Sequence, residues 1–201
     1  MRLTLLDYGA CNVASVERAL QRLGADSQRG ATAECIANAE ALVLPGVGHF
    51  ETLMRALDAH SLRAPLLHAL ARGVPFLGIC LGLQALYLAS DEAPDLSGLQ
   101  LLPARVRSLP PVVKLPHMGW NRLLFKRKSR LLDGIDADAY FYFAHSYAAM
   151  NDRPETVATC GYGTDFVAVL EKKNICAVQF HPEKSGAAGA QVLRNFLRLC
   201  A

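Results

Sequence analysis

Cys80 stands at the centre of Gly78-Ile79-Cys80-Leu81-Gly82, with a glycine two residues away on either side. An apolar, strand-like run leads into it from Val74, and the residues after it suit a helix that extends to Leu88. A nucleophile on a tight strand-to-helix turn needs neighbours without bulk, because its backbone is strained. The dipole and free N–H groups of the following helix would favour a thiolate and stabilise an oxyanion. The spacing predicts a nucleophilic cysteine, against the simpler alternative of a cysteine buried in an apolar strand.

A cysteine nucleophile needs a base, and the sequence offers six histidines, at positions 49, 60, 68, 117, 145 and 181. Context favours His181, because it follows the apolar run Ile175–Phe180 and the carboxyl ends of strands in open α/β sheets hold ligand sites. Glu183 lies two residues on, on the same side of an extended segment, where its carboxylate would orient the imidazole. We therefore predict Cys80, His181 and Glu183 as nucleophile, base and orienting group. By itself, His-Pro-Glu would read more simply as a strand ending in a proline turn.

A second loop, Pro45-Gly46-Val47-Gly48, follows the apolar run Ala41–Leu44. Two glycines around one residue allow the backbone to approach a ligand closely, or allow the peptide plane to turn over at little cost. The same loop could serve only as a tight connection between a strand and a helix. The residues alone leave these two interpretations open.

The elements that must position these residues alternate through the first half of the chain. Strands are expected at Leu3–Asp7, Ala25–Arg29, Ala41–Leu44 and Pro75–Ile79, and helices at Val13–Leu23, Phe50–Leu57 and Leu62–Ala71. Alternating strands and helices are typical of a parallel α/β sheet.

The pattern changes near Pro94, after which extended segments dominate. They are expected at Leu101–Leu109, Arg122–Phe125, Ala139–Ala144, Thr156–Cys160 and Phe166–Leu170, with a hairpin at Glu171–Asn174 and a closing helix at Ser185–Leu199. We therefore expect one α/β domain over residues 1–201. It would hold a mostly parallel sheet with flanking helices and a smaller, partly antiparallel sheet.

Composition narrows the class of protein. The 201 residues are 52% hydrophobic, enough for a sizeable core, and the net charge of +3 is too small to imply a nucleic-acid or membrane-surface role. The six cysteines form no C-x-x-C pair and no zinc-like spacing, so we expect reduced thiols in a cytoplasmic protein and no metal site. No apolar stretch approaches the ~18–20 residues needed to span a bilayer. The basic run Lys126–Lys128 fits a solvated turn better than an anion or partner site.

The paired motifs Gly78–Gln84 and Gln179–Glu183 resemble the signatures of class I (triad-type) glutamine amidotransferases. Further motifs look like those of the glutaminase subunits of imidazole glycerol phosphate synthases. They are Asp7-Tyr8-Gly9 with Asn12, Pro45–Gly48, Pro116–Asn121, Tyr142–Tyr147 and Glu183-Lys184-Ser185. The resemblance covers the chain from Leu3 to the final helix.

This resemblance implies a flavodoxin-like sheet and hydrolysis of L-glutamine to glutamate and ammonia, without a cofactor. It also implies that the ammonia passes to a separate cyclase (HisF-type) subunit, which forms imidazole glycerol phosphate and AICAR in histidine biosynthesis. On this basis Cys80 would attack the side-chain amide, His181 would protonate the leaving ammonia, and Glu183 would orient His181.

Further roles follow from the resemblance alone. The backbone N–H of Leu81, with that of Val47 or Gly48, would form the oxyanion hole. Residues expected to bind glutamine are Gly48, Gln84, His145, Ser146 and Tyr147, and residues expected to meet the cyclase are Asn12, Trp120, Tyr142 and Lys184. The chain departs from the usual family pattern at Cys11, where glycine is common, and at His49, where a small residue is common.

Two alternatives remain open at this point. A different cysteine hydrolase, such as a peptidase or a γ-glutamyl hydrolase, would share the three predicted residues but act without a partner. A non-catalytic α/β binding or regulatory module would keep only the scaffold, although the presence of Cys80, His181 and Glu183 counts against it.

Overall fold

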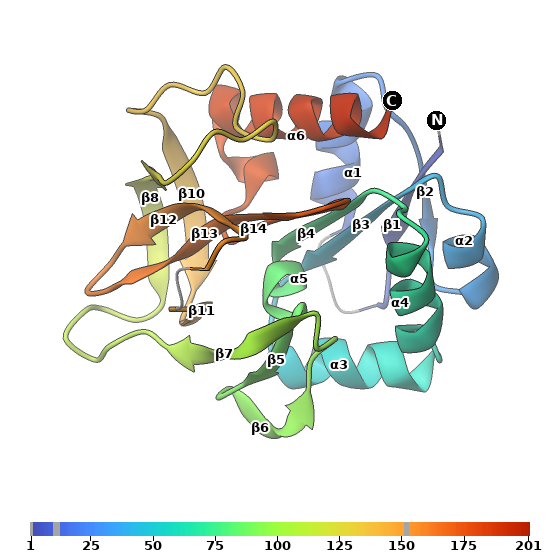
Figure 1. The fold of residues 1–201 in the computed structure, drawn as a ribbon, viewed down its shortest axis with the longest axis horizontal. Helices are drawn as coiled ribbons and strands as arrows, with labels where there is room; N and C mark the ends of the chain where they lie inside the picture. The colour runs from blue at the N-terminus through green and yellow to red at the C-terminus, as the bar shows by residue number, and fades with distance from the viewer. Residues whose placement is uncertain (1, 10–12, 151–152) are drawn as a thin grey trace.

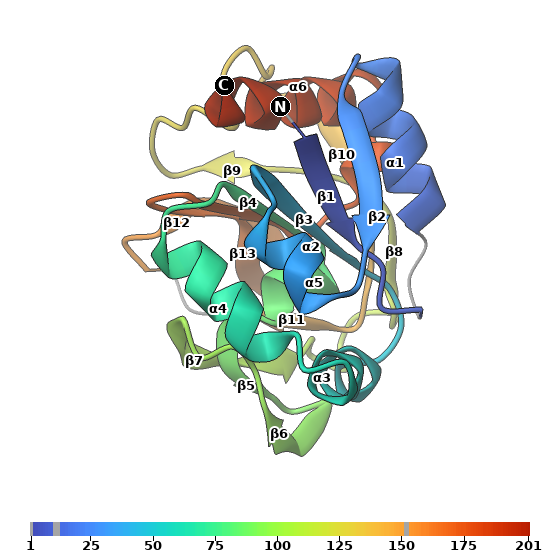
Figure 2. The ribbon, with the colours of Figure 1, turned by 90° about the vertical axis from the view of Figure 1, so that its right-hand side faces the viewer.

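Helices cover both faces of a central sheet in the computed structural model, which describes residues 2–9, 13–150 and 153–201 (Figures 1 and 2). One face carries α1 (Val13–Arg22) and α6 (Gly186–Cys200), and the other carries α2 (Ala33–Ala37), α3 (Phe50–Ala59) and α4 (Arg63–Ala71). The predicted sandwich of helices around a sheet is confirmed.

The central sheet has eight strands in the order β2-β1-β3-β4-β14-β13-β12-β9. Their bounds are β1 (Arg2–Leu6), β2 (Asp26–Gly30), β3 (Ala41–Gly46), β4 (Phe76–Cys80), β9 (Leu124–Phe125), β12 (Thr156–Gly161), β13 (Asp165–Lys172) and β14 (Ile175–Val178). The strands from β2 to β14 pair in parallel, and those from β14 to β9 pair antiparallel. The parallel part has the 2-1-3-4-5 order of flavodoxin-like folds.

Strand β3 shows why the parallel strands are apolar throughout. All six of its residues are buried. Ala41 and Val43 pack into the core on the α1 and α6 side, whereas Leu42 and Leu44 pack into the core on the α3 and α4 side. Because successive side chains point to opposite faces, a strand covered on both faces must be apolar at every position.

Two smaller sheets flank this core. One has four strands in the order β11-β7-β5-β6, with bounds β5 (Tyr87–Ser90), β6 (Ala93–Ser97), β7 (Leu102–Ser108) and β11 (Tyr147–Ala149). Only β5 and β7 pair in parallel there, so the predicted smaller, partly antiparallel sheet is confirmed. The other pairs β8 (His117–Arg122) with β10 (Tyr140–His145) in an antiparallel ladder.

The prediction that a helix runs from Cys80 to Leu88 is wrong in length. Helix α5 covers only Leu81–Gln84, and strand β5 begins at Tyr87. The carbonyls of Ala85, Leu86, Tyr87 and Leu88 accept hydrogen bonds from the backbone N–H groups of residues 98–102. A longer helix would need those carbonyls for its own ladder, so pairing with a distant segment ends it.

The glycines around Cys80 are required by close backbone packing. Cys80 has φ of 53°, in the left-handed region. A Cβ on Gly82 would lie 2.0 Å from the Leu44 carbonyl oxygen, and one on Gly78 would lie 2.7 Å from the Gly82 oxygen. The predicted elbow is confirmed: Cys80 has a strained backbone and stands between residues without bulk.

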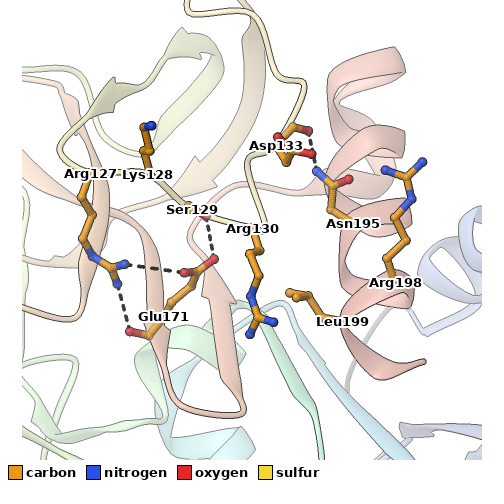
Figure 3. Close-up of a pocket in the computed structure, with 9 residues that line it drawn as sticks. All are labelled: Arg127, Lys128, Ser129, Arg130, Asp133, Glu171, Asn195, Arg198 and Leu199. Atoms are coloured by element: carbon orange, nitrogen blue, oxygen red, sulfur yellow. Dashed lines mark hydrogen bonds and ion pairs between the residues drawn. The ribbon is translucent and has the colours of Figure 1, made fainter.

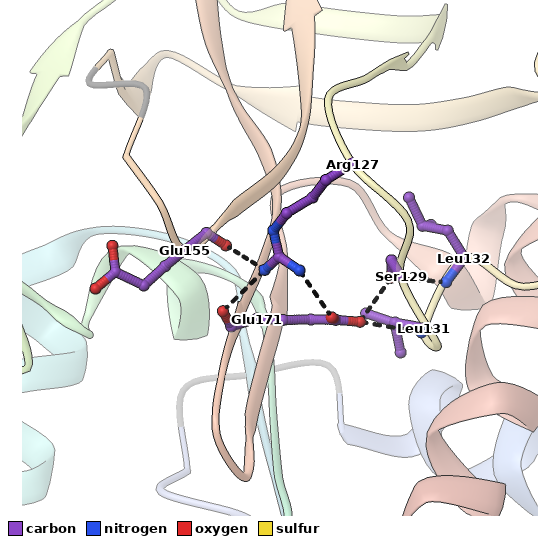
Figure 4. Close-up of polar contacts among 6 residues, drawn as sticks. All are labelled: Arg127, Ser129, Leu131, Leu132, Glu155 and Glu171. Atoms are coloured by element: carbon purple, nitrogen blue, oxygen red, sulfur yellow. Dashed lines mark hydrogen bonds and ion pairs between the residues drawn. The ribbon is translucent and has the colours of Figure 1, made fainter.

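A partly buried carboxylate, that of Glu171, holds the basic segment that follows β9. Glu171 Oε1 accepts hydrogen bonds from Ser129 Oγ at 2.6 Å and from the Leu131 N–H at 3.0 Å. Its other oxygen lies 3.7 Å from Arg127 Nη1, and Arg127 also donates to the Glu171 and Glu155 carbonyls (Figure 4). Arg127 therefore balances the charge of Glu171, and the basic run is more than a solvated turn at this position.

A cavity of about 730 Å³ lies beside this segment. Figure 3 shows Arg130 between the β13–β14 hairpin and the C-terminal part of α6, which carries Arg198. Asn195 of α6 donates to the carbonyls of Leu131 and Asp133 at 3.0 and 2.7 Å and so ties the helix to the segment. Cations near a helix C-terminus complement its dipole, which gives these arginines a structural role.

We expect Gly82→Ala to lower the free energy of unfolding by about 3 kcal/mol or more, because the added methyl meets a backbone oxygen. Urea unfolding followed by circular dichroism measures this. Gly161→Ala is the matched control, because its Cβ would meet only the Asp165 side chain, at 3.3 Å, and should change stability by less than about 1 kcal/mol. Equal effects of the two substitutions would contradict the elbow argument.

We expect Glu171→Ala to cost about 1–3 kcal/mol, because it leaves the Leu131 N–H and Ser129 without their acceptor and Arg127 without its carboxylate. Asp91→Ala is the control, because its ion pair with Arg105 is exposed and should contribute little. The same urea titration compares the two variants. An effect at Glu171 no larger than at Asp91 would show that the carboxylate does not hold the segment.

Candidate active site

Three neighbouring parallel strands end at the same edge of the sheet and bring the predicted residues together. In the register, Gly46 of β3 lies opposite Cys80 of β4, and Ile79 of β4 lies opposite Val178 of β14. The Val47-Gly48 loop therefore lies on one side of Cys80, and the segment leading to His181 lies on the other. Carboxyl ends of parallel strands are where open α/β sheets place ligand sites.

The three residues predicted as a triad are buried and in contact. Cys80 and His181 line the same cavity, and His181 Nδ1 lies 2.9 Å from Glu183 Oε1, with both of the latter side chains 3% exposed. Burial by itself lowers the pKa of the His181 imidazole, but hydrogen bonds and charge interactions with Cys80 and Glu183 outweigh it and raise that pKa to about 10. The arrangement favours the protonated imidazolium form of His181.

Glu183 reaches His181 by a route other than the expected one. The sequence predicts an extended segment with a same-side offset of two residues, whereas residues Pro182–Lys184 form a 3-10 turn, η1. Ser185 Oγ donates to the His181 carbonyl at 2.6 Å and accepts from the Tyr142 N–H at 3.0 Å, which anchors this turn to β10. The contact was predicted correctly, but its local geometry was not.

The sequence analysis also overestimates how much the dipole of the helix after Cys80 favours a thiolate. A helix of only four residues, Leu81–Gln84, has a weak dipole, so it adds little to the stability of a thiolate. Gln179 Nε2 donates to Cys80 Sγ at 3.5 Å, and His181 lines the same cavity as Cys80. These side chains take over the role that the sequence gives to the dipole.

A cavity of about 160 Å³ opens next to Cys80. All the residues expected to bind glutamine line it, together with Cys80, His181 and the three oxyanion-hole candidates: Val47, Gly48, Leu81, Gln84, His145, Ser146 and Tyr147. The larger cavity beside α6 contains none of these residues. Because a reaction at Cys80 needs space beside its sulfur, the smaller cavity is the candidate active site.

Gln84 is held so that one polar atom remains for a ligand. Its Nε2 donates to the Tyr147 carbonyl at 2.7 Å and to Gln179 Oε1 at 3.2 Å. A side-chain amide has two N–H donors, so both are used. The Gln84 side-chain oxygen is therefore the atom that can accept a hydrogen bond in the cavity.

Sequence reasoning missed two residues of this site. Gln179 is fully buried and donates to Cys80 Sγ, and the only signal for it is its place directly before Phe180-His181. Glu92 lines the cavity and accepts a hydrogen bond from the Phe50 N–H at 2.8 Å. Nothing near Glu92 in the sequence marks it, because the β5–β6 turn that places it was not predicted.

Three of the residues expected to meet a partner cluster on one face. Trp120 of β8 and Tyr142 of β10 lie opposite each other in the ladder, with their rings 5.9 Å apart. Lys184 Nζ lies 5.6 Å from the centre of the Tyr142 ring and also lines the active-site cavity. Trp120 is 54% exposed, which is unusual for so large an apolar side chain.

Two residues singled out by the sequence lie outside the described part of the chain, namely Asn12 and Cys11. The other departure from the family pattern, His49, has a structural role as the N-cap of α3. Its Nδ1 accepts a hydrogen bond from the Glu51 N–H at 3.2 Å. A side chain that satisfies a free N–H at a helix start stabilises that helix.

The described residues contain neither a cluster of metal ligands nor a helix suited to cross a membrane. Among residues 2–9, 13–150 and 153–201, no three His, Cys, Asp or Glu side chains are grouped to hold a metal ion. Over the same ranges, none of the helices has the length and apolar character needed to cross a membrane.

Residues 4–200 match the family model described as glutamine amidotransferase class-I. Curated relatives named imidazole glycerol phosphate synthase subunit HisH also match nearly the whole chain. The one from Methanothermobacter thermautotrophicus is 47% identical over 98% of both chains, and the one from Pectobacterium atrosepticum is 45% identical over 99% of this chain and all of its own.

The chain belongs to the class-I glutamine amidotransferases, within the HisH family. Solved structures support the fold of this amidotransferase. One titled "Structure of PurLQS from Thermotoga maritima" has a TM-score of 0.77 at 18% identity, covering 98% of this chain and 97% of that chain. Another, titled "Crystal structure of glutamine amidotransferase", has a TM-score of 0.76 at 20% identity and covers 98% of each chain.

We expect Glu183→Gln to lower the pKa of His181, because the substitution removes the charge that favours the imidazolium. The imidazolium then stabilises the Cys80 thiolate less, and alkylation of Cys80 by iodoacetamide at pH 7 should slow by about tenfold. Peptide mass spectrometry across pH 5–9 separates Cys80 from the other cysteines. Glu51→Gln, an exposed change, should leave the profile unaltered, and an unchanged profile in Glu183→Gln would refute the charge argument.

Proposed function

We propose that this chain hydrolyses L-glutamine to glutamate and ammonia through a thioester on Cys80 and supplies the ammonia to the cyclase subunit of an imidazole glycerol phosphate synthase. The observation that carries this proposal is the position of Cys80 between His181 and the Val47-Gly48 loop, inside a cavity lined by Gln84 and His145–Tyr147. Membership of the HisH family supports the substrate and the pathway.

In the first half-reaction, the Cys80 thiolate attacks the carbon of the glutamine side-chain amide. Negative charge develops on the amide oxygen, and the N–H of Leu81 and that of Val47 or Gly48, residues that line the cavity, would stabilise it. His181 holds its Nδ1 against Glu183, so its Nε2 is the nitrogen that faces Cys80. That Nε2 gives its proton to the departing nitrogen, which leaves as ammonia, and a thioester remains on Cys80.

In the second half-reaction, neutral His181 takes a proton from a water molecule, which attacks the thioester carbon. A second oxyanion forms at the same backbone N–H groups and collapses to release glutamate and regenerate the thiolate. Glu183 keeps the imidazole in one orientation through both steps. The triad thus moves one proton to ammonia and recovers one from water, so the chain returns to its starting state.

Recognition of the amino acid end of glutamine falls to groups away from Cys80. The Glu92 carboxylate lines the cavity and would attract the α-ammonium group, and the Gln84 side-chain oxygen can accept one of its hydrogens. A γ-glutamyl peptide also carries this α-ammonium, so the family relationship, and not this contact, favours glutamine.

The proposed docking surface for the cyclase comprises Trp120, Tyr142 and Lys184 and, by family resemblance, Asn12. An exposed tryptophan beside a tyrosine and a lysine is the kind of patch that buries well against a partner. Because Lys184 also lines the active-site cavity, a partner on this surface would cover the route by which ammonia leaves. We further propose that the chain works in the cytoplasm, in keeping with free thiols at all five cysteines that the structure describes.

We expect Cys80→Ala to abolish formation of product from glutamine, because the thioester cannot form, while the complex keeps its use of free ammonium ions. A coupled assay of the chain with a cyclase subunit, run with glutamine or with ammonium chloride, measures both. Cys35→Ala is the control, because Cys35 lies on α2, and should leave both activities intact. Glutamine-dependent turnover by Cys80→Ala would exclude the proposed mechanism.

A further inference from the structure

Two histidines that take no part in the proposed proton transfers lie buried at the active-site cavity, which His145 lines. His117 of β8 and His145 of β10 are opposite each other in the ladder and are 4% and 6% exposed. The His117 ring stacks between Phe143 and Tyr162, with ring centres 4.9 and 3.9 Å away. Packing fixes the plane of this ring, so its nitrogens point in set directions.

Hydrogen-bond partners fix the protons on both rings. His145 Nδ1 lies 2.9 Å from the Tyr147 carbonyl, which can only accept, so that nitrogen carries the proton. In a neutral ring the His145 Nε2 is then an acceptor, and His117 Nδ1, 3.3 Å away, must donate to it. Burial lowers the pKa of His117 to about 4 and that of His145 to about 3, which keeps both rings neutral.

Asn121 sets the direction of hydrogen-bond donation through His117 and His145. Its Oδ1 accepts from the Arg122 N–H at 2.8 Å and its Nδ2 donates to the Gly161 carbonyl at 3.0 Å, so the orientation of the amide is set. The second hydrogen on Nδ2 points to His117 Nε2, 3.5 Å away. Every donor from Asn121 to the Tyr147 carbonyl therefore faces the same way.

The Tyr147 carbonyl joins this chain to the active site. It accepts from His145 and also from Gln84 Nε2, at 2.7 Å. Gln84 in turn donates to Gln179, which donates to Cys80 Sγ. Because the Tyr147 carbonyl accepts hydrogen bonds from both His145 and Gln84, its position is linked to both side chains. The position of Gln84 therefore depends on His145 and, through it, on His117.

We propose that His117 is a positioning residue for glutamine: through His145 it holds the Tyr147 carbonyl, and with it the Gln84 amide that meets the substrate. This inference rests on the proposed function. It gives a role to the Pro116–Asn121 motif beyond Trp120, and it places that role on the strand whose other face carries the proposed cyclase contact.

The alternative is that His117 serves only as an aromatic filler between Phe143 and Tyr162. The two roles separate experimentally, because phenylalanine at this position keeps the stack but provides no donor. Asparagine provides a donor close to the Nδ1 position, whereas glutamine places its amide close to the Nε2 position. The variants His117→Asn and His117→Gln are therefore matched in polarity and differ in which neighbour they can reach.

The test measures kcat and KM for glutamine with the full chain in complex with a cyclase subunit. We expect His117→Phe and His117→Gln to raise KM by about tenfold, as for the loss of one positioned hydrogen bond, and His117→Asn to stay within about threefold of the wild type. Iodoacetamide alkylation of Cys80 should change by less than about twofold in all three, because the hydrogen bonds of Tyr147, Gln84 and Gln179 separate the sulfur from His145. Equal KM values in the asparagine and glutamine variants, or an unchanged KM in His117→Phe, would overturn the inference.

A measurement on the wild-type protein tests the proton positions without any substitution. Nitrogen-15 NMR of the imidazoles should show His117 and His145 both neutral at pH 7, with the proton on Nδ1. A proton on Nε2 of either ring would overturn the inference, even where a variant fails to fold. A wild-type complex that releases no ammonia from glutamine would instead overturn the proposed function. If the wild-type complex is active but the KM values of the His117 variants or the proton positions differ from those expected, only this inference is overturned.

Discussion

Parallel pairing between β4 and β14 is the constraint on which the site depends. The two strands are about a hundred residues apart in the chain, yet their register places Gly78 opposite Ala177 and Ile79 opposite Val178. Strand β4 delivers Cys80 at its end, and β14 delivers the segment with His181 and Glu183. A shift of one residue would turn either set of side chains to the other face of the sheet and separate the nucleophile from its base.

Close packing makes this register possible and strains the nucleophile at the same time. The Leu44 carbonyl on β3 lies where a side chain on Gly82 would be, and Gly78 allows the chain to turn back over itself. Cys80 adopts a left-handed φ of 53° as a result. The core therefore holds the sulfur in one place, at a cost in backbone strain that the buried apolar strands offset.

The buried histidines near the active site differ in charge. Near Cys80, Glu183 favours a charged imidazole at His181, whereas His117 and His145 are kept neutral by burial. A charged ring needs an anionic partner inside a protein, whereas His145 contacts the Tyr147 carbonyl and the neutral His117 ring. One kind of histidine can transfer protons, and the other can only direct hydrogen bonds.

The sequence was enough to predict the alternation of elements, the elbow at Cys80 and the three residues of the proposed triad, because each depends on local spacing or on motifs that repeat across a family. It failed at the length of the helix after Cys80, since the carbonyls of Ala85–Leu88 are taken by residues 98–102, a pairing that no local pattern records. Tertiary structure alone decided that Gln179 reaches the sulfur, that Glu92 lines the cavity and that Glu171 balances Arg127. These are contacts between residues distant in the chain, fixed by strand order and register and not by propensity.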